Sequence, residues 1–115
     1  MKHIVISGLI EKVCSVWSDI DAGIEYKASV LKVVNNRLAE LTSPQEENFI
    51  KIEIVRAICR QLKLRYPNYA KAVDDVLRPF EWQLQRDQMA VLPFKQIDTL
   101  TYRIYMQQTI TGFAV

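Results

Sequence analysis

The stretch Ser43-Pro44-Gln45-Glu46 marks the start of a helix and divides the chain into helical segments. A serine hydroxyl in this position accepts from the backbone N–H three residues on, and Glu46 can reach back toward the serine. Pro44 fills the first helical position, where its missing N–H costs nothing. The stretch therefore predicts a helix boundary, but it carries no information about activity.

The helix that begins there, residues 44–65, carries apolar side chains around most of a helical wheel. Only a narrow strip is polar, and we expect so apolar a helix to be the central one. The segment 65–68 ends it, because proline disfavours helical geometry in the residue before it, and Asn68 is expected to cap the next helix.

Two amphipathic helices are predicted upstream, over residues 7–20 and 22–41, with a break at 19–23. Each groups its apolar residues on one side, as a surface helix does. The spacing in the second helix is typical of a bundle seam. The seam contains Ile24, Lys27, Leu31, Val34, Leu38 and Leu41.

A single helix kinked at Pro79 is predicted from about residue 68 to residue 90, because its apolar positions keep one phase across the proline. Two shorter helices are the alternative. Leu92-Pro93 ends the segment. The apolar stripe consists of Val73, Val76, Leu77, Phe80, Leu84 and Val91.

Residues 94–111 combine helical spacing with a β-prone composition. Ile97, Leu100 and Ile104 have the spacing of one helix face, whereas the threonines and tyrosines around them favour a strand. We expect a helix, because Pro93 suits its start. A strand pairing with residues 2–7 is the alternative.

The composition is that of one globular domain. The chain has 115 residues, 50% hydrophobic and 24% charged, with a net charge of +2. That charge gives no global field that demands nucleic acid or a membrane, and no apolar run is long enough to span a bilayer. We expect a cytoplasmic all-α domain covering residues 1–115, a compact bundle of four to five helices, one kinked at a proline. Its core should contain Leu31, Ile54, Ile58, Leu62, Val73 and Phe80.

The residue inventory argues against an enzyme. His3 is the only histidine and lies near the N-terminus, which is a poor place for a Ser-His or Cys-His system. Cys14 and Cys59 lack C-x-x-C spacing and are expected to be reduced, buried thiols. Three isolated glycines exclude a P-loop and a dinucleotide fingerprint. We expect no catalytic residue and no cofactor.

Paired aspartates are weak candidates for a metal site. Asp19 and Asp21 resemble the opening of a calcium loop, but Ile24 and Val30 occupy the positions that need glycine and the closing acid. Capping and solvation explain the aspartates better. We expect no metal.

A basic strip on the central helix is one binding candidate. Arg56, Arg60 and Lys63 align on its polar side and are extended by Arg65, a geometry that could follow a phosphate backbone. Pairing of Arg56 with Glu53 on a merely solvated face is the alternative. We favour this alternative, because the near-balanced charge lacks the usual nucleic-acid footprint.

The second candidate is a tryptophan opposite the apolar stripe of its own helix. Arg78, Trp82 and Arg86 recur at every fourth residue, with Met89 alongside. A tryptophan that points away from the core needs a partner, and Trp and Arg dominate the energetics of protein interfaces. Burial under the terminal segment and stacking on an unpaired base are the alternatives.

We therefore expect a non-catalytic helical interaction module: an adaptor, an inhibitor or a small accessory subunit of a protein complex. It would bind another protein or a second copy of itself, since the apolar central helix needs neighbours on nearly every side. A nucleic-acid-associated accessory subunit that contacts phosphates through the basic helix face is the alternative. The sequence indicates neither a membrane partner nor a small-molecule substrate.

Overall fold

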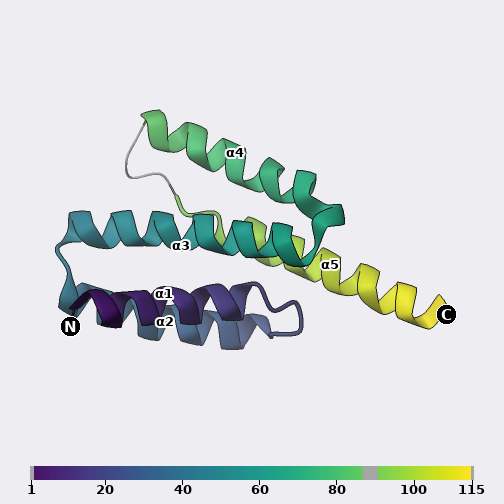
Figure 1. Cartoon of the computed structure of the whole chain (residues 1–115), viewed down its shortest axis with the longest axis horizontal. Helices are drawn as coiled ribbons and strands as arrows, with labels where there is room; N and C mark the ends of the chain where they lie inside the picture. Colours follow the sequence, from purple (N-terminus) through teal and green to yellow (C-terminus); the bar gives the residue numbers. More distant parts are fainter. Residues whose placement is uncertain (1, 87–90, 115) are drawn as a thin grey trace.

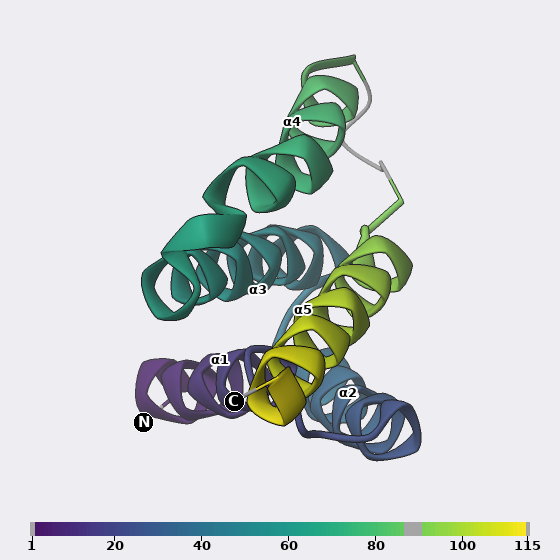
Figure 2. The ribbon, with the colours of Figure 1, turned by 90° about the vertical axis from the view of Figure 1, so that its right-hand side faces the viewer.

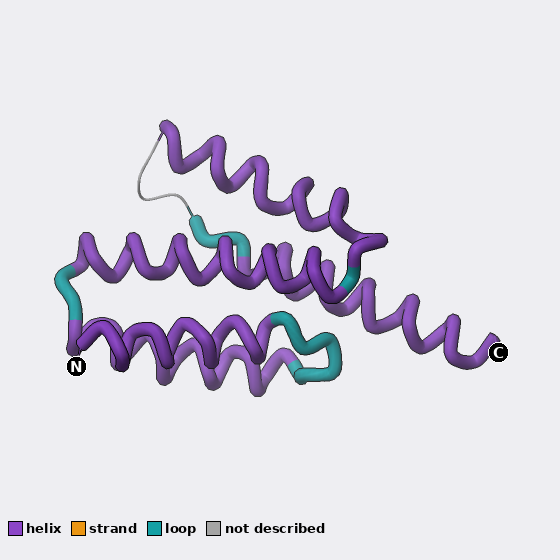
Figure 3. Tube along the Cα trace, in the orientation of Figure 1, coloured by secondary structure: helices purple, strands orange, loops and turns teal. Residues whose placement is uncertain are grey.

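The computed structural model describes residues 2–86 and 91–114, with their side chains as far as residue 108. This part of the chain is helical and contains no strand (Figure 3). The elements are α1 (Lys2–Trp17), α2 (Ile24–Leu41), α3 (Pro44–Arg65), the short 3-10 helix η1 (Pro67–Tyr69), α4 (Ala70–Arg86) and α5 (Phe94–Ala114). The expected all-α class and number of helices are confirmed.

The helix α3 lies between the other layers of the bundle. The antiparallel pair α1 and α2 packs on one side of it, and α4 lies on the other side (Figure 1). The helix α5 crosses the bundle and contacts α4 and α1 (Figure 2). Its C-terminal end extends beyond the other helices, and the molecule measures 51 × 30 × 22 Å.

The start of α3 shows the predicted capping pattern. Ser43 Oγ accepts a hydrogen bond from the Glu46 backbone N–H at 3.3 Å, and Pro44 occupies the first turn. The Ser43 hydroxyl also donates to the Glu46 carboxylate at 3.4 Å. The bounds of α3 are the predicted ones, because local capping signals set both of its ends.

The helix α3 supplies the largest share of the core, as predicted. Its buried residues are Ile50, Ile54, Val55, Ile58, Cys59 and Leu62. Around them lie Val13 and Trp17 of α1, Val34 and Leu38 of α2, Val73 and Phe80 of α4, and Ile97 and Ile104 of α5. Leu31 was expected in the core but is only half-buried. The buried face of α2 is centred on Val30 and Val34 instead.

The two terminal segments do not pair as strands. The strand alternative for residues 2–7 and 94–111 is wrong, since both segments are helical. Burial of Ile97, Leu100 and Ile104 on one helix face outweighs the β-prone composition. The first helix also starts earlier and ends earlier than the predicted range 7–20.

The helix α4 continues through Pro79, so the alternative of two shorter helices is wrong. The kink at Pro79 stays a prediction. Asn68 lies within η1 and does not cap α4, which begins at Ala70. The described part of α4 ends at Arg86, and residues 87–90 lie outside the described residues. Val91 is 83% exposed, so it does not extend the buried stripe.

Candidate functional site

Trp82 lies on the outer face of α4 and is 64% exposed. The Arg86 guanidinium carbon lies 5.1 Å from the centroid of the indole ring, a cation–π contact. Arg78 is also partly accessible on this helix. The predicted position of Met89 lies outside the described residues. The alternative in which the terminal segment buries Trp82 is wrong for the described chain.

The amphipathic pattern of α4 explains this orientation. Phe80 and Val73 are buried against the bundle, and the helix turns Trp82 to the opposite side. An exposed tryptophan leaves a large apolar surface in water. The structure therefore brings Arg78, Trp82 and Arg86 onto one accessible face, which we call the Trp82 face.

The basic strip of α3 is partly occupied by α4. Arg56 donates from Nε and Nη2 to the two carboxylate oxygens of Glu81 at 2.7 and 2.8 Å, and from Nη1 to Glu53 at 3.1 Å. These hydrogen bonds raise the pKa of Arg56 and lower that of Glu81. This bidentate geometry fixes the position of α4 relative to α3.

A second ion pair lies further along the same two helices. Lys63 Nζ is 2.8 Å from the Asp74 carboxylate. Arg65 donates to the Ser18 backbone carbonyl at 3.3 Å, and Arg60 is exposed. The four predicted basic residues therefore do not form one open strip, since Arg56 and Lys63 face α4.

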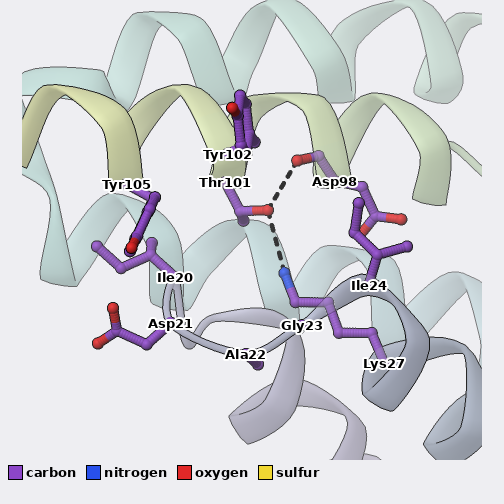
Figure 4. A pocket seen from close by; sticks show the side chains of 10 residues that line it. All are labelled: Ile20, Asp21, Ala22, Gly23, Ile24, Lys27, Asp98, Thr101, Tyr102 and Tyr105. Atoms are coloured by element: carbon purple, nitrogen blue, oxygen red, sulfur yellow. Dashed lines mark hydrogen bonds between the residues drawn. The ribbon is translucent and has the colours of Figure 1, made fainter. Parts of the chain in front are cut away.

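The structure reveals a buried lysine that the sequence interpretation did not single out. Lys27 of α2 is 2% exposed, and its Nζ donates to Thr101 Oγ1 of α5 at 3.1 Å (Figure 4). The Thr101 hydroxyl donates in turn to the Asp98 backbone carbonyl at 2.9 Å. Burial lowers the pKa of Lys27, although Asp98 and Asp19 oppose this shift.

The Asp98 carboxyl group lies near this lysine. Burial raises the pKa of Asp98, and the nearby Lys27 and the Trp17 indole partly offset the shift. Asp98 Oδ1 is buried and has no hydrogen bond of ordinary geometry among the described residues. The signal for this site was present in the sequence, because Lys27 falls in the apolar seam of its helix.

The two cysteines are free thiols, Cys59 buried and Cys14 half-buried. Burial raises the pKa of Cys14, and burial together with the Asp74 charge raises the pKa of Cys59 to about 11. Since the thiolate is the reactive form, neither thiol is activated at neutral pH. Cys14 differs from the prediction in being only half-buried.

The described residues contain no group of three side chains that could hold a metal ion. The Asp19 carboxylate instead accepts a hydrogen bond from the Asp21 backbone N–H at 3.0 Å, as in an Asx turn. Asp19 thus stabilises the loop between α1 and α2 and does not cap α2, whose N-cap is Gly23.

Comparison with known proteins adds no relative. No protein family, curated protein or solved structure matches the chain. Among the described residues, none of the helices has the length and apolarity that crossing a bilayer requires.

Proposed function

We propose that the chain is a non-catalytic helical interaction module, an adaptor, inhibitor or small accessory subunit, that binds a protein partner through the Trp82 face. The observation that carries this proposal is the 64% exposure of Trp82 on a helix whose opposite side is buried. An aromatic ring flanked by arginines is the composition that dominates interface energetics. The expected setting is the cytoplasm.

The exposed surface of α3 supports assembly with a further chain. Phe49 is 64% exposed and Leu64 is 73% exposed, although they belong to the central helix. A homodimer or a hetero-complex would cover such side chains. Light scattering at high micromolar concentration tests self-association, and a monodisperse monomer would leave the hetero-complex as the proposal.

The ion pairs between α3 and α4 reduce the support for the nucleic-acid alternative. Arg56 and Lys63 are held by Glu81 and Asp74, so a phosphate would have to compete with carboxylates that are already in place. The Trp82 face keeps its two arginines available to solvent. A protein partner is therefore the better-supported proposal.

The test is a pull-down with the tagged full chain, performed with and without nuclease. We expect a protein that is retained after nuclease treatment and lost with Trp82→Ala. Tyr26→Ala is the matched control, because Tyr26 is 56% exposed on α2, at the other side of the bundle (Figure 1). Equal loss with both variants, or retention with both, would contradict the proposal.

A salt titration separates the two kinds of partner. Each phosphate contact releases counterions, so losing one arginine should flatten the slope of log affinity against log salt by about one unit. For a protein partner we expect Arg78→Ala and Arg86→Ala to lower the affinity without that change of slope. Flattened slopes in both variants would favour nucleic acid instead.

A further inference from the structure

The ammonium group of Lys27 is poorly satisfied for a buried cation. It has three N–H donors, and among the described residues it makes one hydrogen bond, to the neutral Thr101 hydroxyl. A buried charge is costly unless it is paired and hydrogen-bonded. Burial therefore makes the charged form of Lys27 less favourable than it is in an exposed lysine, in agreement with the lowered pKa of Lys27.

This amine lies in a pocket between α5 and the loop that joins α1 to α2. The pocket has a volume of about 250 Å³. Ile24 and Tyr102 belong to its wall and are 63% and 60% exposed, so the pocket reaches the surface. The remaining lining is Ile20, Asp21, Ala22, Gly23, Asp98, Thr101 and Tyr105 (Figure 4).

The charges around the pocket select against an anion. The Asp98 carboxyl and Asp21 belong to the lining, and Asp19 acts on Lys27 through its charge. Three acidic residues thus lie around one amine, and the Asp19 and Asp21 carboxylates are the charges that oppose an anion. An anionic ligand would meet repulsion here, whereas a neutral ligand with an apolar body would meet the isoleucine and tyrosine walls without that cost.

We propose that Lys27 is a carbonyl-reactive amine, and that its pocket takes small neutral aldehydes, which Lys27 Nζ binds as an imine. The nitrogen lone pair forms a C–N bond to the carbonyl carbon while the C=O π pair moves to oxygen. Proton transfer from nitrogen to that oxygen gives a carbinolamine. Loss of one water then gives C=N, and no oxidant or reductant is consumed.

The neighbouring groups have defined parts in this step. Thr101 Oγ1 holds the amine in place through the 3.1 Å hydrogen bond. The Asp98 carboxyl supplies a proton to the departing hydroxyl and then, as the carboxylate, balances the charge of the protonated imine. Desolvated lysines of this kind are the ones that form Schiff bases.

The experiment is reductive trapping on the full chain. Benzaldehyde is added with sodium cyanoborohydride, and the label on each lysine is quantified by peptide mass spectrometry. We expect the label on Lys27 to exceed that on the exposed Lys32 and Lys95 by several-fold. The excess should disappear in urea, because it depends on the folded pocket. Label on Lys27 that is no greater than on Lys32 and Lys95 would overturn the proposal.

Two matched probes test the charge and the size of the pocket. The anionic 4-carboxybenzaldehyde and the larger pyrene-1-carboxaldehyde should each lower the label on Lys27 relative to Lys32. The same relative label with all three aldehydes would show that the pocket does not select, and would contradict the assignment. Trp82→Ala should leave the trapping unchanged, so this proposal and the proposed protein interaction fail or hold separately.

Discussion

The two tryptophans of this chain occupy opposite environments. Trp17 is 2% exposed, and its ring centroid lies 5.2 Å from that of Phe94 at an interplanar angle of 60°. Trp82 is 64% exposed and lies beneath Arg86. The first tryptophan joins α1 to the start of α5, whereas the second contributes little contact to the bundle. In our proposal, stability and binding are therefore carried by different aromatic residues.

Removal of the buried tryptophan should have the largest effect. Trp17→Ala deletes a fully packed side chain, and it should lower the free energy of unfolding by about 3–5 kcal/mol. Urea denaturation monitored by circular dichroism measures the loss, with Trp17→Phe as a milder control. A loss below about 1 kcal/mol, well under that range, would place Trp17 outside the core.

Truncation of a central residue of α3 should have the second-largest effect on stability. Ile58 is fully buried, and Ile58→Ala should cost about 2–5 kcal/mol through lost transfer energy and the cavity it leaves. The same denaturation experiment measures it. The control is Ile4→Ala, since Ile4 is 74% exposed and its loss should barely change stability. Equal effects of the two variants would mean that α3 is not the central helix.

The Arg56–Glu81 ion pair between α3 and α4 should contribute less to the free energy of unfolding. Glu81→Gln removes one carboxylate from a partly exposed ion pair, so we expect a loss of up to about 1 kcal/mol at neutral pH. Glu40→Gln is the control, because the Arg37–Glu40 pair lies within one exposed helix face. A larger loss in the control would contradict the structural role of the Glu81 pair.

Acid titration tests how the stabilisation by the Glu81 carboxylate changes with pH. The folded pKa of Glu81 lies below its usual value of 4.5, because Arg56 hydrogen-bonds to the carboxylate. The stabilisation is therefore complete above that value and is lost as the pH falls through the folded pKa. The difference in unfolding free energy between wild type and Glu81→Gln should shrink over this range. A difference in unfolding free energy that stays constant with pH would contradict the pairing of Glu81 with Arg56.

The exposed tryptophan should have the smallest effect on folding. Trp82→Ala removes a side chain that lies largely in water, so the free energy of unfolding should change by no more than about 0.5 kcal/mol. Thermal or urea unfolding beside Trp17→Ala makes the comparison direct. Ready unfolding of this variant would show that Trp82 belongs to the core.

Local sequence signals were sufficient to predict the ends of a helix that is capped by its own residues. The serine cap and the first-turn proline of α3 act within a few residues, so its bounds were predictable. The orientation of Trp82 was also predictable, because Phe80 and Val73 fix the inner face of the same helix. The first feature depends on local capping residues and the second on the apolar period of one helix, and neither requires contacts with distant parts of the chain.

Contacts between distant segments were not predictable. The burial of Lys27 depends on Thr101, which lies 74 residues along the chain. The pairing of Arg56 with Glu81 depends on how α4 folds back on α3. The sequence showed that Lys27 shares the seam of its helix, but it indicated no partner for the ammonium group. A single sequence does not reveal such tertiary pairs.

The most direct test of the central claim is the affinity of the partner recovered after nuclease treatment, titrated against wild type and Trp82→Ala. We predict that the variant binds more weakly by at least about 2 kcal/mol, roughly thirtyfold, as expected for an aromatic hot spot. Tyr26→Ala should bind as wild type does. Equal affinities of wild type and Trp82→Ala would contradict the claim that the Trp82 face is the binding surface.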